Sequence, residues 1–238
     1  DDAEARRLLG LAAAQGHATA QANLGSMHYE GEGGPQDYAE ARRLFGLAAA
    51  QGHADAQDAL GSMHYKGDAG PQDYAEARRL LGLAAAQGHP DAQCMLGSMH
   101  YFSQGGPQDF AEARRLFGLA VAQGHAAAQH SLGSMHCARP GQGGPQDYAE
   151  ARRLLGLAAA QGYANAQCGL GRMHSLGHGG PRDHAEARRL LGLAAAQGHA
   201  EAQFALGEMH LKGQGGPQDS AEARRLYGLA AAQGHAEA

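Results

Sequence analysis

The chain has 238 residues and a formal net charge of -5, with 37 glycines, no tryptophan and few aromatic residues. This mild charge argues against a general nucleic-acid binder and against a protein that coats acidic membranes. No apolar run approaches the roughly 18 residues that a membrane-spanning helix needs, and the N-terminus does not resemble a signal peptide.

A block of thirty-six residues recurs along the whole chain, and the hexapeptide Ala-Glu-Ala-Arg-Arg-Leu marks each copy. The hexapeptide begins at Ala3, Ala39, Ala75, Ala111, Ala149, Ala185 and Ala221, so the spacing is 36 except for one step of 38. The glycines fall at the same places in each copy, which indicates turn and cap positions rather than disorder. Self-similarity at this period predicts a solenoid of stacked units, with the two extra residues inside the segment from Cys137 to Gly144.

The second copy shows the first helix of the repeat. Asp37 can cap a helix over residues 38–51, and Glu40 stands at the third helical position of a capping box. Gly52 follows where a left-handed residue commonly ends a helix. We therefore expect a first helix of about four turns in each copy.

A second helix is predicted over residues 54–65, where Ala56, Leu60 and Met63 recur at helical spacing before Gly67. The whole chain then contains six helical hairpins plus a seventh first helix that starts near Ser220. We expect one all-α solenoid domain over residues 1–238. Because the chain begins and ends inside a repeat, we also expect it to be a fragment of a longer array.

The first helix has two faces at 100° per residue. Residues on the packing face are Ala41, Leu44, Phe45 and Ala48, and those on the outward face are Arg42, Arg43, Gly46 and Ala50. A glycine in mid-helix costs roughly 1 kcal/mol relative to alanine, yet Gly46 has an equivalent in every copy. Close contact between successive first helices is the first explanation, and a ligand that approaches the bare backbone is the second.

The run from Leu24 to Gln57 resembles the Sel-one-like repeat family, a slightly longer relative of the tetratricopeptide repeat. The residues that carry the resemblance are Leu24, Gly25, Gly31, Gly33, Asp37, Ala41, Leu44, Phe45, Ala48, Ala49, Gly52, His53 and Ala56. His28, Gly34 and Leu44 depart from the Tyr, Val and Trp that are frequent there. The resemblance covers essentially the whole chain. It implies a right-handed superhelix of αα hairpins, with the first helices on the concave side, that serves as an adaptor or scaffold for proteins and has no enzymatic activity.

The candidate partner-binding residues are an arginine pair, the mid-helix glycine and the leucine that follows it. They are Arg42, Arg43, Gly46, Leu47, Arg78, Arg79, Gly82, Leu83, Arg114, Arg115, Gly118, Leu119, Arg152, Arg153, Gly156, Leu157, Arg188 and Arg189. An apolar floor with guanidinium edges would suit an acidic or amphipathic peptide. The alternative is that the arginines pair with glutamates such as Glu40 three residues away, and that Leu47 only seals neighbouring first helices.

Signatures of catalysis and of cofactor binding are missing from the sequence, and the glycines at 31–34 lie between two helices rather than after a strand. His53 and His64 are roughly 16 Å apart along a helix, which is too far for one zinc ion. We therefore predict no catalytic residue, no cofactor and no metal. The first rival to a scaffold is a structural spacer or consensus-like array without a dedicated ligand, and an enzyme or small-molecule receptor is less favoured.

Three cysteines, Cys94, Cys137 and Cys168, do not form a disulfide framework. Two of them occupy the same position two repeats apart, roughly 20 Å, whereas a disulfide needs Cα atoms within about 7 Å. Free thiols favour a reducing compartment such as the cytoplasm.

Two further expectations concern surfaces. One position of the second helix varies widely between copies, as Ala22, Asp58, Cys94, His130, Cys168 and Phe204, which suggests an exposed convex surface. Incomplete terminal repeats should also leave apolar faces near Leu8 and near Leu226 and Tyr227, so end-to-end self-association is expected.

Overall fold

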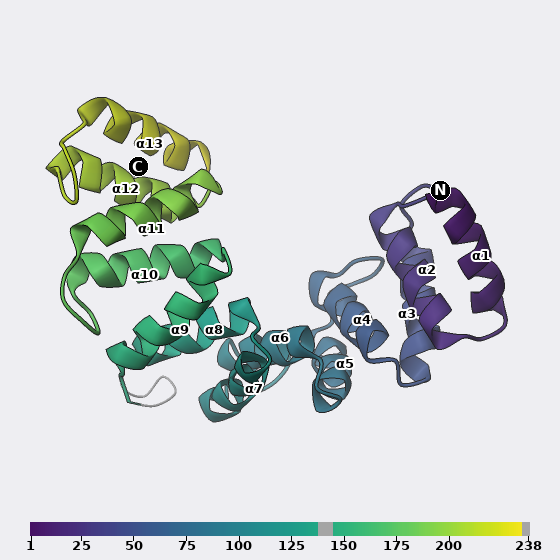
Figure 1. Cartoon of the computed structure of the whole chain (residues 1–238). Coiled ribbons are helices and arrows are strands. Elements are labelled where there is room, and N and C mark those ends of the chain that lie inside the picture. The colour runs from purple at the N-terminus through teal and green to yellow at the C-terminus, as the bar shows by residue number, and fades with distance from the viewer. Residues whose placement is uncertain (138–144, 235–238) are drawn as a thin grey trace. The chain divides into compact units, whose positions relative to one another are not determined.

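A computed structural model describes residues 1–137 and 145–234, and this part of the chain contains thirteen α-helices and no strand (Figure 1). The helices are α1 (Asp2–Ala14), α2 (Ala18–Glu30), α3 (Tyr38–Ala50), α4 (Ala54–Lys66), α5 (Tyr74–Ala86), α6 (Pro90–Tyr101), α7 (Phe110–Ala122), α8 (Ala126–Cys137), α9 (Tyr148–Ala160), α10 (Ala164–Leu176), α11 (His184–Ala196), α12 (Ala200–Lys212) and α13 (Ser220–Ala232). The prediction of an all-α solenoid of helical hairpins is confirmed. The predicted two-residue insertion falls on residues 138–144, outside the described residues.

The helices belong to two compact units, Asp1–Gln123 and Gly124–Ala238. The odd-numbered helices are the first helices of the repeats and are called A helices below, and the even-numbered ones are called B helices. Within each unit, A and B helices alternate, and an A helix packs mainly on the B helices that precede and follow it. One continuous solenoid domain over residues 1–238 stays a prediction.

The caps of the helices agree with the sequence. Asp37 Oδ1 accepts a hydrogen bond from the backbone N–H of Glu40 at 3.0 Å, and Gly52 after α3 has φ 86°. Gly67 ends α4 in the left-handed region with φ 84°. The predicted ends were one residue too long for α3 and one residue too short for α4. Capping residues can be read from the sequence because they act on their own helix.

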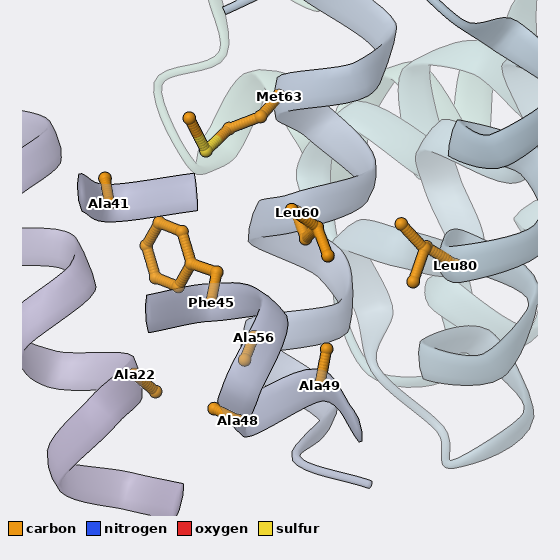
Figure 2. Close-up of a cluster of buried hydrophobic side chains, with 9 residues drawn as sticks. All are labelled: Ala22, Ala41, Phe45, Ala48, Ala49, Ala56, Leu60, Met63 and Leu80. Atoms are coloured by element: carbon orange, nitrogen blue, oxygen red, sulfur yellow. The ribbon is translucent and has the colours of Figure 1, made fainter. Parts of the chain in front are cut away.

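The predicted packing face of the A helices lies in the core, together with residues of the B helices. Phe45 is buried and, in Figure 2, projects from α3 between Ala22 of α2 and the α4 residues Ala56 and Met63. Burying an aromatic side chain of this size contributes roughly 2–3 kcal/mol relative to leaving it exposed. The predicted packing face of this helix is therefore confirmed.

The glycines that allow close helix packing lie in the B helices. A Cβ atom at Gly25 of α2 would lie 2.9 Å from the Phe45 ring of α3, so a larger residue would push the two helices apart. The equivalent glycines, each close to the following A helix, are Gly61, Gly97, Gly133, Gly171 and Gly207.

A chain of side-chain amides connects successive repeats. Gln57 is buried in α4, where its Nε2 donates to the carbonyl oxygen of Ala49 at 3.2 Å and its Oε1 accepts from Nε2 of Gln87 at 2.7 Å. The remaining donor and acceptor pairs are Gln51 and Gln21, Gln123 and Gln93, Gln161 and Gln129, Gln197 and Gln167, and Gln233 and Gln203. These bonds, which were not predicted from the sequence, fix an A helix to the repeat before it.

The variable position of the B helices is not an exposed surface in several copies. Ala22, Cys94 and Cys168 are all buried, and Cys168 packs in one cluster with Leu191 of the next A helix. The expectation of a convex exposed position is wrong there, because this side of the B helix faces a neighbouring helix.

The two predicted apolar ends also differ from each other. Leu8 is 51% exposed, whereas Leu226 is only 2% exposed and packs with the α12 residues Leu206 and Met209. An apolar face at Leu226 was therefore a wrong prediction, because α12 already covers it.

Candidate interaction surface

The glycines in the middle of the A helices border open space. A Cβ atom built at Gly46 would meet no heavy atom within 4 Å, and the same holds at Gly10, Gly82, Gly118, Gly156, Gly192 and Gly228. Close contact between successive A helices, the first explanation for these glycines, is therefore wrong. The A helices pack on B helices instead, so nothing within either unit requires the bare backbone.

The leucine after each of these glycines is exposed as well. Leu47 is 42% exposed, and its equivalents Leu11, Leu83, Leu119, Leu157, Leu193 and Leu229 lie between 41% and 54%. The alternative in which Leu47 only seals neighbouring A helices does not fit this exposure. Each A helix thus presents an open glycine next to an exposed aliphatic side chain.

These residues border a hollow between A helices in the first unit. The hollow lies between α3 and α5 and has a volume of about 370 Å³. Gly46 and Ala50 of α3 line it together with Arg79 and Leu83 of α5, and Leu60 of the intervening α4 also contributes. The sequence-predicted glycine, leucine and second arginine are therefore brought together, although they come from different repeats.

The second unit contains the equivalent hollow between α11 and α13. Its volume is about 410 Å³, and Gly192, Ala196, Leu206, Arg225 and Leu229 are among its lining residues. These residues correspond one for one to those of the first unit. The hollow is thus a property of the repeat and recurs in both units.

The second arginine of each pair is engaged by a glutamate on its own helix. Arg43 Nε and Nη2 donate to the two carboxylate oxygens of Glu40 at 2.8 and 2.6 Å. This hydrogen bond, more than any other influence, lowers the pKa of Glu40. The same pair recurs as Glu4 and Arg7, Glu76 and Arg79, Glu112 and Arg115, Glu150 and Arg153, Glu186 and Arg189, and Glu222 and Arg225. Local pairing is therefore correct for this arginine, and the pair carries no net charge.

The first arginine reaches away from the hollow in five of the seven pairs. Arg42 Nη1 donates to the carbonyl oxygen of Ala69 at 2.9 Å, and its Nη2 lies 3.3 Å from Nε2 of His64. The corresponding pairs are Arg6 and His28, Arg78 and His100, Arg152 and His174, and Arg188 and His210. The prediction that Arg42 faces outward beside Arg43 is wrong, because Arg42 connects α3 to the end of α4 and to the glycine-rich turn. Arg114 occupies the same sequence position in α7.

The histidine of this contact is held in its neutral form. Burial is the largest cause and the charge of Arg42 the next, and both lower the pKa of His64. A neutral imidazole can accept a hydrogen bond from a guanidinium, whereas an imidazolium cannot. Sequence analysis treated His64 as a rejected metal ligand and missed this partner, which lies 22 residues away in the chain.

The described residues form neither a metal site nor a membrane span. Among residues 1–137 and 145–234, no three His, Cys, Asp or Glu side chains gather in an arrangement that could hold a metal ion. No helix in the same ranges has both the length and the hydropathy needed to cross a bilayer.

The chain matches the Sel1 repeat family over residues 1–17, 18–53, 54–89, 90–125, 126–163, 164–199 and 200–235. Each complete match begins with a B helix and continues through the following A helix. No curated protein sequence matches the chain.

Solved structures share the fold. A protective antigen present in uropathogenic Escherichia coli strains, described as displaying an SLR fold, has a TM-score of 0.84 and 34% sequence identity. The similarity covers 96% of this chain but 49% of the antigen, so the chain spans about half the antigen's length.

A Sel1 repeat protein from Oxalobacter formigenes has a TM-score of 0.85 and 24% identity, over 97% of this chain and 96% of that one. The immunity protein Pa5087 from Pseudomonas aeruginosa has a TM-score of 0.56 and 18% identity, over 90% and 81% of the two chains. Because seven repeats match from residue 1 to residue 235, the chain belongs to the Sel1 repeat family.

Proposed function

We propose that this protein is a non-catalytic interaction scaffold that binds a peptide or protein segment on the A face of its units. The A face is the surface formed by Arg43, Gly46 and Leu47 of α3 and their equivalents in the other A helices, of which Gly46, Arg79 and Leu83 line the hollow of the first unit. The observation that carries the proposal is the open space at all seven mid-helix glycines.

These glycines weaken the isolated fold. Each costs about 1 kcal/mol relative to alanine in a helix interior, and alanine would meet no neighbour at Gly46 or Gly82. No contact within a unit offsets this cost. A partner that approaches the helix backbone would explain it, because only glycine leaves the backbone uncovered.

The surrounding surface is consistent with a docking role. An exposed leucine follows every one of these glycines, and the hollow between A helices recurs in both units. Sel1 repeat proteins commonly serve as protein-interaction scaffolds, which supports the same function here.

The proposal can be tested by selecting random peptides displayed on phage against the full chain. Gly46→Gln with Gly82→Gln fills two neighbouring positions with a good helix former and should leave the fold intact. Thr19→Gln places the same side chain at an exposed position of α2 and is the control.

We expect peptides that bind the wild type and the Thr19→Gln control but lose binding to the double glutamine variant. If no peptide is selected, or if every selected peptide binds all three proteins equally, the A face is not the docking site. A spacer without a dedicated ligand is then the better description.

A further inference from the structure

We infer that the segment bound on the A face is extended and uncharged, and that it places an aliphatic side chain in the hollow between two A helices. This inference rests on the proposed function, because it describes the partner of the same surface. The sequence suggested an acidic or amphipathic peptide. The partner inferred here shares the apolar contacts of that peptide but not its acidic residues.

The charges of the A face argue against an acidic partner. Arg79 already uses Nε and Nη2 in its ion pair with Glu76, at 2.7 Å for both bonds. Arg78 is turned away toward His100 and does not line the hollow. The arginine that lines the hollow is therefore neutralised by its glutamate, whereas the charge of Arg78 lies away from the hollow.

The lining of the hollow favours an aliphatic side chain. Leu83 is 44% exposed on one wall, and the bare Gly46 and the small Ala50 form part of the other. Leu60 and Leu80 also line the hollow and are already buried, so an inserted side chain would be surrounded mainly by apolar atoms. An aliphatic group gains free energy in such surroundings, whereas a carboxylate would lose its hydration.

Hydrogen-bonding groups flank the leucine along α5. Arg79 and Leu83 of α5 and its C-cap residue Gln87 are spaced by four residues, so they follow one side of the helix. The ion pair with Glu76 leaves Nη1 of Arg79 as a donor. Gln87 uses Nε2 toward Gln57 and toward the Leu83 carbonyl, which leaves its Oε1 as an acceptor.

A donor and an acceptor on either side of a leucine match the backbone of an extended peptide. Such a peptide presents free C=O and N–H groups, whereas a helix has satisfied nearly all of these groups internally. Arg79 and Gln87 are eight residues apart, which is roughly 12 Å along a helix and about four residues of extended chain. The bare backbone at Gly46 also leaves room for a thin extended strand.

The amide orientation of Gln87 follows from the contacts of Gln57. Because Gln57 Nε2 donates to the Ala49 carbonyl, Gln57 Oε1 must be the acceptor for Gln87. Gln87 therefore contributes its nitrogen to the bond and keeps its oxygen for a partner. The same polarity applies to Gln123 and Gln197, which donate to Gln93 and Gln167.

The inference is tested by sequencing the phage peptides selected on the full chain. Leu83→Ser is added as a further variant, because it removes aliphatic surface without filling the hollow. We expect clones with Leu, Ile, Val or Met among uncharged residues, without a helical pattern and with proline tolerated. A synthetic copy of the strongest clone, titrated by fluorescence anisotropy, should lose about tenfold or more in affinity with Leu83→Ser. Its affinity should change less than about threefold between low and high salt.

Three outcomes overturn the inference, and they differ in what they say of the proposed function. Acidic clones that bind the A face with strong salt dependence, or amphipathic clones with leucines at helical spacing, would contradict the inference but keep the proposed docking face. Clones that are insensitive to both the glutamine and the serine variants would contradict the proposed function as well.

Discussion

The side-chain amide of Gln87, the C-cap residue of α5, donates to Oε1 of Gln57 in α4 at 2.7 Å, and Gln57 donates in turn to the Ala49 carbonyl in α3. One chain of hydrogen bonds thus crosses three consecutive helices. Gln57 is 4% exposed, so its Oε1 takes its hydrogen bond from Gln87 rather than from bulk water. Leaving a buried acceptor without a partner costs about 1–3 kcal/mol.

Gln87→Ala is therefore expected to lower the free energy of unfolding by about 1–2 kcal/mol, because it leaves Gln57 Oε1 buried without a donor. Urea unfolding followed by circular dichroism measures the change. Gln72→Ala is the matched control, since its bond to the Tyr65 carbonyl lies at an exposed turn. If both variants lose the same free energy of unfolding, the buried amide chain contributes no more to stability than an exposed hydrogen bond.

A pair of glycine substitutions separates the open mid-helix glycine Gly82 of α5 from the packing glycine Gly61 of α4. Gly82→Ala should raise the free energy of unfolding by about 0.5–1 kcal/mol, because its Cβ would enter open space in a helix interior. Gly61→Ala should lower it by about 1–3 kcal/mol, because its Cβ would lie 2.9 Å from Leu81 Cγ. Thermal and urea unfolding of both variants test the assignment, and a destabilising Gly82→Ala would contradict it.

The sequence predicts well whatever acts within one helix. Asp37 and Gly52 were found as caps, and the pairing of Arg43 with Glu40 was kept open as an alternative, because these contacts span only a few residues. The packing face with Phe45 also followed from the period of the helix.

Contacts between neighbouring helices could not be predicted from the sequence in this way. Helical spacing gives the direction of Gly46 and Gly25 around their own helices but not what lies opposite, so the close approach was assigned to the wrong glycine. Arg42 and Arg43 are adjacent in sequence, and only the placement of His64 and of the glycine-rich turn gives them different partners.

Acid should weaken the contacts between arginine and histidine. The pKa of the histidine in each contact lies below the usual 6.5, mainly because of burial and next because of the neighbouring arginine. These histidines are His28, His64, His100, His174 and His210. Below about pH 6.5, these histidines bind protons more readily in the unfolded chain than in the folded protein. The contacts between arginine and histidine therefore contribute fully to stability above about pH 6.5, and this contribution is lost as the pH falls through the folded-state pKa values.

Replacing His28, His64 and His100 by glutamine should therefore reduce the fall in urea midpoint between about pH 7.5 and about pH 5.5. His17→Gln, at an exposed position of the same unit, is the control. A triple variant with the same pH dependence as the wild type would show that these contacts do not sense protons.

Asp58 is expected to have the opposite pH dependence. Burial is the main cause that raises the pKa of Asp58 to about 6. The charge of His89 lowers this pKa, and the carboxylates of Asp91 and Asp55 raise it further. A folded-state pKa above the unfolded value means that the ionised form destabilises the protein above about pH 6, and that this effect disappears as the pH falls below 3.8.

Asp58→Ala introduces the residue that Ala22 provides in the preceding repeat. It should stabilise the protein by on the order of 2 kcal/mol at about pH 7.5 and by much less at about pH 4. Glu32→Ala is the control, because Glu32 is exposed and its charge is not among those that act on Asp58, and urea midpoints at both pH values give the comparison. A gain that does not depend on pH would assign the effect to packing rather than to charge.

Thiol chemistry provides a test of the packing. Burial raises the pKa of Cys94 and of Cys168 to about 12, so neither should react with a disulfide reagent while the protein is folded. The half-buried Cys137 should react first, and slowly, because burial raises its pKa as well. All three should react at once in guanidinium chloride, and fast release of three equivalents from the native protein would contradict the buried positions.

Each bond of the glutamine chain joins only neighbouring repeats, and this locality has a consequence for chain length. Deleting the thirty-six residues 54–89 would bring Gln93 to the place of Gln57 beside Ala49, while Gln123 would still donate to Gln93. Whole repeats can thus be lost or duplicated in a gene without any compensating substitution. The number of hollows can therefore change in single evolutionary steps, and under the proposed function the length of the bound segment would change with it.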